Sequence, residues 1–290
     1  MSVPTQTITG IRGPLAKYGI TKGLELPPIE KLRLYIMSLP GAGKTNFISS
    51  FPDTLIIDPE ATAEFVPNPV AHRITPDDGK QLNELINDLC SDGPKTFKHI
   101  CVDTIEKMVQ VSIPYLTDRH NAKMKPDKQL TDIREFGMKG AGWGKVNDYI
   151  LGIFQRLVNA GFGWTICGHL SMVTYEEHGK TQVRLEPLIN PGIRGGLLRD
   201  SQYLMRVRKD TKNVLKASRP GGPKTKSVEE SWTLQLQVLE TSDPTTLLLK
   251  NRLGHLLPAE INITNEKDHP VGHAKLKAAY DAAREKAKAL

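Results

Sequence analysis

The stretch "YIMSLPGAGKTNFISSFP", residues 35–52, gives the strongest indication of the fold of this chain. An apolar run stops at a loop with two glycines, a Lys-Thr pair follows, and helical spacing then resumes. The pattern G-x-x-x-x-G-K-[ST] fits this loop, except that a serine replaces the first glycine. Glycines let backbone N–H groups converge on an anion, and the positive end of the next helix faces the phosphates. The loop therefore predicts a site for ATP and Mg²⁺, formed by Ser38, Pro40, Gly41, Ala42, Gly43, Lys44, Thr45 and Asn46.

Individual residues of this loop have distinct expected roles. Lys44 is placed to reach the β- and γ-phosphates and so to take part in catalysis, and the Thr45 hydroxyl is placed to bind Mg²⁺. A P-loop alone does not show whether the phosphate is hydrolysed, transferred or only sensed. The ends of the other strands decide that question.

Three further strand ends carry polar candidates. Asp103 ends the apolar "HICVD", where it either holds Mg²⁺ through water or caps the next helix. In "TLIIDPE", Glu60, and with less support Asp58, is placed to orient and deprotonate an attacking water, or else lies in a surface turn. His169 ends "WTICG", where it either senses the γ-phosphate or makes a structural hydrogen bond.

Strand and helix patterns alternate up to about residue 170, which predicts an α/β fold with a mostly parallel sheet flanked by helices. Strand-like pieces beyond that point predict an antiparallel extension. We expect an N-terminal arm at 1–28, a core at 29–258 and a C-terminal helical tail at 259–290. The expected strands are 32–37, 54–58, 98–103 and 164–168, and the expected helices cover 77–90, 105–116 and 144–161.

Composition narrows the class of protein. The chain has 290 residues, of which 39% are hydrophobic and 24% charged, as is ordinary for a soluble protein. No apolar stretch approaches the roughly 18 residues of a membrane span, and the N-terminus has no apolar signal core. Cys90, Cys101 and Cys167 are widely spaced and form no metal-binding pattern, which favours buried free thiols in a reducing cytosol. We therefore expect a cytoplasmic protein without a membrane partner.

Positive charge is concentrated in two stretches. Residues 199–226 hold nine basic residues against two acidic ones, an excess equal to the +7 of the whole chain. Residues 119–145 hold seven against three and overlap a polar stretch at 117–142, long enough to be functional. Both indicate an anionic partner or a solvated face. In the second stretch Trp143 and Phe136 either stack on bases or pack in the core, and the basic candidates are Arg119, Lys123, Lys125, Lys128, Lys139 and Lys145.

The order of these motifs resembles the RecA-type recombinase core. The motifs are "LPGAGKT", "LIIDPE", "HICVD", "WTICGH" and then "GIRGGLLRDSQYLMRVRK". Two further segments, "WGKVNDY" and "LLLKNRLGHLLP", are similar to segments of the compact phage branch of RecA-like ATPases, described as single-strand annealing proteins. The resemblance covers about residues 30–258 and implies a RecA-like P-loop NTPase core.

The resemblance also implies roles for particular residues. Glu60 becomes the water-activating base, Asp103 the Mg²⁺ carboxylate, and His169 the sensor in place of the usual glutamine. Single-stranded DNA would bind two loops, at 117–142 and roughly 171–192. The nucleotide would lie between subunits of a homo-oligomer, where a basic residue of the neighbour reaches the γ-phosphate. The candidates for that residue are Arg206, Arg208, Lys209, Lys250 and Arg252.

Together these features predict an ATP-dependent, single-stranded-DNA-binding recombination protein with DNA-stimulated ATP hydrolysis. The sequence leaves open annealing or strand exchange, a ring or a filament, DNA or RNA preference, and a single-strand-binding protein as a further partner. If the phage resemblance holds, the location is the cytoplasm of a bacterial host. The alternatives are a DNA motor ATPase of the helicase or packaging type, a P-loop phosphotransferase acting on a small molecule, and a nucleotide-bound scaffold without turnover.

Overall fold

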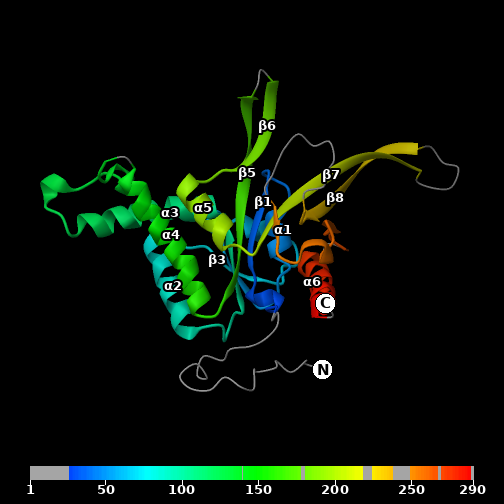
Figure 1. The fold of residues 1–290 in the computed structure, drawn as a ribbon, viewed down its shortest axis with the longest axis horizontal. Coiled ribbons are helices and arrows are strands. Elements are labelled where there is room, and N and C mark those ends of the chain that lie inside the picture. Colours follow the sequence, from blue (N-terminus) through cyan, green and yellow to red (C-terminus); the bar gives the residue numbers. More distant parts are fainter. Residues whose placement is uncertain are drawn as a thin grey trace.

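A single mixed sheet forms the centre of the protein. The computed structural model describes residues 26–138, 140–177, 180–217, 224–237, 249–266 and 269–288. Within them the strand order is β10-β8-β7-β1-β5-β4-β2-β3, with β6 paired to β5 and β9 paired to β7 (Figure 1). The strands are β1 Arg33–Ser38, β2 Thr54–Ile57, β3 His72–Ile74, β4 His99–Asp103, β5 Gly163–Glu177, β6 Lys180–Pro187, β7 Tyr203–Ala217, β8 Lys224–Gln235, β9 Lys250–Asn251 and β10 Glu260–Asn262.

The direction of the strands divides the sheet into two parts. Neighbours from β3 through β2, β4, β5 and β1 to β7 run parallel. The strands β6, β8, β9 and β10 add to it antiparallel. This confirms the predicted α/β fold, with a mostly parallel sheet flanked by helices and an antiparallel extension. One detail differs from the expectation, because β7 begins parallel to β1; a helix between β6 and β7 supplies the crossover that a parallel pair needs.

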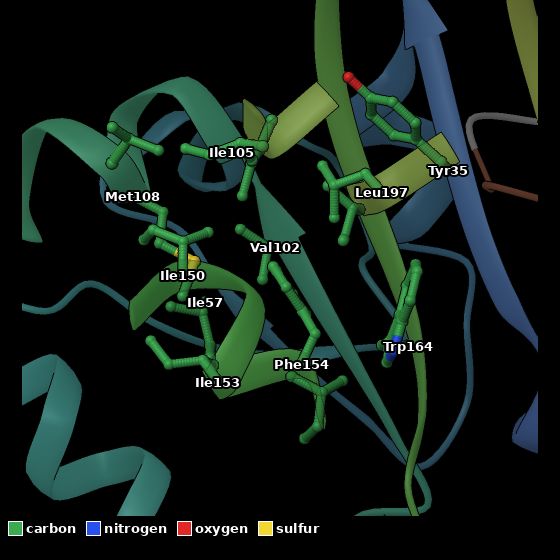
Figure 2. Packing of buried hydrophobic residues seen from close by; sticks show 14 of the residues in the cluster. Tyr35, Ile57, Val102, Ile105, Met108, Ile150, Ile153, Phe154, Trp164 and Leu197 are labelled. Carbon is green, nitrogen blue, oxygen red and sulfur yellow. The ribbon is translucent and has the colours of Figure 1, made fainter. Parts of the chain in front are cut away.

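Helices cover both faces of the sheet (Figure 1). One apolar cluster packs α2 to α5 on one face, and the other packs α1 and α6 on the opposite face. Alternation along β1 shows the division, since Tyr35 and Met37 belong to the first cluster and Leu34 and Ile36 to the second. Figure 2 shows the first cluster around Phe154. The helices are α1 Lys44–Ile48, α2 Gly79–Asp92, α3 Ile105–Asn121, α4 Ala141–Asn159, α5 Pro191–Asp200 and α6 Gly272–Lys288.

The polar stretch expected at 117–142 is more ordered than its composition suggests. Helix α3 continues to Asn121, and α4 already begins at Ala141. Two short 3₁₀ helices, Pro126–Lys128 and Ile133–Glu135, lie between them. Ile133 is buried in the first apolar cluster and anchors this lobe, which projects at the left of Figure 1. The lobe therefore presents its exposed basic side chains on a fixed framework.

The second expected loop, at 171–192, is mostly a β-hairpin. Its residues form the paired strands β5 and β6 and the first turn of α5. The glycine pair of "GIRGGLLRD", expected just before a basic strand, lies within helix α5. The basic stretch at 199–226 forms a second long hairpin, β7 and β8, whose tip at 218–223 lies outside the described residues. Both hairpins project well beyond the helices (Figure 1).

The C-terminal residues pack on the rest of the chain. Strand β10, beyond the expected boundary at residue 258, pairs with β8. Helix α6 buries Leu276, Tyr280 and Ala283 in the second apolar cluster, and the Tyr280 hydroxyl donates to the Pro27 carbonyl (2.9 Å). Of the expected N-terminal arm, only residues 26–28 are described. No helix in the described ranges combines the length and apolar character needed to cross a bilayer.

Candidate functional site

The P-loop connects β1 to α1 and turns at two glycines. Gly41 and Gly43 have φ angles of +74° and +92°, a region that other residues rarely adopt. Gly43 is the N-cap of α1, so the first N–H groups of that helix have no partner within the helix. Ala42 is buried beside them, whereas Pro40 is exposed. The backbone of the loop therefore has the conformation that a phosphate cradle requires.

Lys44 turns back across this loop. Its side chain is buried, and its ammonium donates to the Ser38 hydroxyl oxygen (3.0 Å). The Ser38 hydroxyl in turn donates to the carbonyl of Leu39 (2.8 Å). The serine that replaces the first motif glycine therefore has a defined contact, because it holds the catalytic candidate Lys44 over the loop. Asn46 lies half-buried in the first turn of α1.

The predicted metal ligands Thr45 and Asp103 are in direct contact. The Thr45 hydroxyl donates to Asp103 Oδ2 (2.5 Å), although 58 residues separate them. Asp103 Oδ1 is buried and has no hydrogen-bond partner among the described residues. Burial raises the pKa of Asp103 to about 6, against the lowering effect of the Thr45 hydrogen bond and the Lys44 charge. A cation bound here would favour the ionised carboxylate.

These two oxygens fit Mg²⁺. The Thr45 hydroxyl donates its hydrogen bond to Asp103, so its oxygen lone pairs remain available to a metal. Asp103 Oδ1, on the same carboxylate, has no hydrogen-bond partner among the described residues. Among the described residues no group of three or more His, Cys, Asp or Glu side chains is arranged to hold a metal ion. Mg²⁺ does not require one, because it is commonly bound by one or two protein oxygens together with substrate phosphates and water.

The two carboxylates after β2 differ in burial and in the contacts that they make. Asp58 is fully buried and accepts from the Ala63 N–H (2.7 Å) and the Thr62 hydroxyl (3.3 Å), so it holds the turn that follows the strand. Glu60 is exposed, and its Oε1 accepts from the Thr104 hydroxyl (3.2 Å). Thr104 directly follows Asp103, and Glu60 therefore lies beside the metal candidates, as a water-directing base requires.

His169 ends the part of β5 that pairs with β1. It is in register with Ser38, so the sensor candidate and the start of the P-loop lie on neighbouring strands. Glu106 Oε1 accepts from the His169 backbone N–H (2.8 Å), and Glu106 Oε2 lies 3.6 Å from His169 Nδ1. The sequence did not single out Glu106 or Thr104. The feature of the sequence that could have identified them is their position just after Asp103, at the start of the next helix.

Trp232 is a further contact of the P-loop that the sequence analysis missed. A Cβ atom added to Gly43 would lie 2.7 Å from the Trp232 Cδ1 atom, so the indole packs directly on the loop. The Lys209 ammonium lies 5.4 Å from the centroid of the Trp232 ring and 2.7 Å from a Glu230 carboxylate oxygen. Trp232 lies on β8, far from the P-loop in sequence, and no local pattern marks it.

Some of the basic candidates already make contacts within the chain, and others do not. Lys250 donates to the carbonyls at the end of α5, the shortest of these bonds being 2.6 Å to Ser201. Arg208 is paired with Asp210 and Glu260. In the lobe, Lys145 lies 4.1 Å above the Phe136 ring. Phe136 and Trp143 both pack against the first apolar cluster, and the side chains that remain exposed without an ion pair in the described ranges include Lys123, Lys125, Lys128 and Arg252.

A large cleft lies between the start of α2 and helix α3, away from the P-loop. Its volume is about 670 Å³, and Lys80, Lys107, Tyr115 and Arg119 are among its lining residues. No residue of the P-loop lines it. The cleft is therefore separate from the candidate phosphate site at the P-loop.

These features are those of a P-loop ATPase domain: a mostly parallel sheet, a glycine turn in the P-loop, the contact of Lys44 with Ser38, and the contact of Thr45 with Asp103. A family model described as an AAA domain matches residues 30–253, and this chain belongs to that family. A search of curated proteins gives no match. Among solved structures, the crystal structure of the RadB recombinase is similar with 14% identity and a TM-score of 0.37, covering 81% of this chain and 89% of that one.

Proposed function

We propose that this chain hydrolyses ATP with Mg²⁺ and uses the cycle to control binding of single-stranded DNA during recombination. The observation that carries hydrolysis is the contact of Glu60 with Thr104, next to the Thr45–Asp103 pair. In this site Lys44 contacts the β- and γ-phosphates, Thr45 and Asp103 hold Mg²⁺, and Glu60 takes a proton from the attacking water. When bound, Mg²⁺ neutralises charge that develops on the phosphates.

The support for DNA is electrostatic. The lobe between α3 and α4 exposes Lys123, Lys125 and Lys128, and the hairpin of β7 and β8 carries most of the basic stretch at 199–226. Phosphate contacts by such residues release counterions, so binding should weaken steeply as salt rises. Phe136 and Trp143 both pack against the first apolar cluster and so attach the lobe to the core. Lys145 and Arg134 already lie over these rings, at 4.1 Å from the Phe136 centroid and 5.8 Å from that of Trp143, so base stacking there would require these cations to move.

We further propose that the active form is a homo-oligomer in which Arg252 of one subunit reaches the γ-phosphate of the next. Of the five sequence candidates, Lys250 caps α5, and Arg208 and Lys209 are paired with carboxylates. Arg206 is also engaged in an interaction within the chain. Arg252 is exposed on the segment after β9 and makes no ion pair with the described residues. An arginine supplied in trans can raise the hydrolysis rate by about 10³–10⁵.

The test is the rate of ATP hydrolysis with and without single-stranded DNA, for the wild type and for Glu60→Gln. We expect stimulation by DNA in the wild type and loss of turnover, with nucleotide binding retained, in Glu60→Gln. Turnover that DNA does not change would contradict the coupling. It would favour a phosphotransferase, whose turnover would instead depend on a small-molecule acceptor. Directed movement along duplex DNA would favour a motor ATPase.

A further inference from the structure

The turn that carries Glu60 is built around one buried residue. The Asp58 N–H donates to the Ile74 carbonyl on β3 (2.9 Å), and the Ala61 N–H donates to the Asp58 carbonyl (3.2 Å). The second bond closes a four-residue turn in which Glu60 holds the third position, directly after Pro59. Because proline fixes one backbone angle of such a turn, the path of the chain up to Glu60 is restricted.

Asp58 also holds the residues that follow the turn. Its side chain is fully buried, its Oδ1 accepts from the Thr62 hydroxyl (3.3 Å), and its Oδ2 accepts from the Ala63 N–H (2.7 Å). Together with its carbonyl, Asp58 therefore accepts hydrogen bonds from the three consecutive residues after Glu60. Since both carboxylate oxygens are buried and engaged, Asp58 is poorly placed to take a proton from water itself.

The backbone at Ala61 has a conformation that needs such support. Its φ angle is +58°, in the left-handed region that few residues other than glycine, asparagine and aspartate adopt. A residue persists in a strained conformation when neighbouring contacts fix it, and such positions gather at functional sites. The bonds from Ala61 and Ala63 to Asp58 are contacts of this kind, and the strained residue directly follows Glu60.

The carboxylate end of Glu60 meets a different element. Glu60 Oε1 accepts from the Thr104 hydroxyl (3.2 Å), and Thr104 directly follows the metal candidate Asp103. Glu60 is exposed, and a long exposed side chain loses conformational entropy whenever it is held in one position. A turn that fixes the Glu60 backbone reduces the number of positions open to the carboxylate and so favours the one beside Thr104.

We propose that Asp58 is a positioning residue for hydrolysis, which holds Glu60 where it can take a proton from the attacking water. The inference rests on the proposed function, because it takes Glu60 as the base. Without the Asp58 carboxylate the turn keeps only its backbone bonds, and Glu60 samples unproductive positions. Misplacing a catalytic group by about 1 Å can cost about 100-fold in rate. The loss falls on kcat, since the hydrogen bonds of the Asp58 carboxylate go to the turn and not to the P-loop.

Steady-state ATP hydrolysis, together with calorimetric affinity for a non-hydrolysable ATP analogue, tests this role. Asp58→Ala should lower kcat about 10- to 100-fold, whereas KM and the affinity for the analogue should stay within about threefold. Asp58→Asn should recover most of kcat, because an amide oxygen can still accept from the Ala63 N–H. In a Glu60→Gln background, Asp58→Ala should lower the residual turnover no further, because residues that act as a unit are not additive.

Two further variants separate positioning from folding. Thr62→Val removes one donor to Asp58 at an exposed position, and should lower kcat about threefold even if Asp58→Ala does not fold. Asp53→Ala removes an exposed carboxylate, paired with Lys98, at the other end of β2 and should keep the wild-type kcat.

Wild-type kcat in Asp58→Ala, or in Thr62→Val where Asp58→Ala does not fold, would overturn the positioning role. A loss confined to KM, or an equal loss of turnover in the Glu60→Gln background, would overturn it as well. Wild-type turnover in Glu60→Gln alone would instead overturn the proposed function, since Glu60 would then not be the base.

Discussion

His99 should make the stability of this protein depend strongly on pH. Its ring is fully buried between β4 and its neighbours, and burial lowers its pKa from 6.5 to about 4. The Nδ1 atom lies 2.9 Å from the Glu30 carbonyl and Nε2 lies 2.7 Å from the Thr165 hydroxyl. A carbonyl only accepts, so Nδ1 carries the proton and Nε2 accepts from Thr165. The neutral ring is thus the form that the fold requires.

The sign and size of the effect follow from this difference in pKa. Between pH 6.5 and about 4 the unfolded chain binds a proton at His99 that the folded protein excludes, so stability rises with pH. The contribution is complete above pH 6.5 and is lost as pH falls toward 4. The slope is about 1.4 kcal/mol per pH unit, and the total loss is about 3 kcal/mol. Burial also lowers the pKa of His273, which acts in the same direction.

Urea unfolding at several pH values between 7 and 4.5 measures this slope, and His99→Gln removes it. The variant should be less stable at pH 7, because an amide cannot reproduce both ring contacts. Its free energy of unfolding should nevertheless fall less steeply with acid, so that the two curves converge. Other titrating groups cancel in the difference between the proteins. The exposed His255, replaced by Gln, is the matched control. Parallel curves for the wild type and His99→Gln would show that protonation of His99 does not cause the loss of stability in acid.

Three further predictions concern the site and the C-terminal helix. Gly43→Ala should weaken nucleotide binding more than Gly41→Ala in a calorimetric titration, because both strain a positive φ but only a Cβ at Gly43 meets Trp232; equal losses would contradict this contact. Asp103→Asn should lower affinity at least about tenfold with Mg²⁺ and little with EDTA; an equal loss in both would argue against a metal role. Leu276→Ala should cost about 2–5 kcal/mol in urea unfolding, whereas the exposed Lys286→Ala should stay within about 0.5 kcal/mol.

Local chemistry made part of this protein predictable from its sequence. The P-loop turn needs positive φ at Gly41 and Gly43, and strand and helix periodicity surround it. The ends of β2, β4 and β5 were found to within a few residues in the same way, except that β5 runs on into a hairpin. Polar residues at those ends, Glu60, Asp103 and His169, were therefore recognised as candidates. Parallel strands bring such ends to one edge of a sheet.

Boundaries in the polar stretch were not predictable in the same way. Its lysines and glycines suggested a loop at 117–142, yet α3 and α4 both extend into it. Burial of Ile133 against α3 and α4 gives the segment an anchor that no local pattern announces. Tertiary packing outweighs a weak helix preference, as it commonly does at element ends.

The phosphate loop, the alternating α/β order and the strand ends that carry polar residues could all be predicted from the amino-acid sequence. They follow from glycine conformation and from periodic burial, which act over a few residues. Which of those residues contact one another became visible in the three-dimensional fold alone. The contact of Thr45 with Asp103, the packing of Trp232 on Gly43, and the contact of Glu106 with His169 depend on strand order and helix placement. Such contacts arise between segments distant in the chain, where no spacing along the sequence records them.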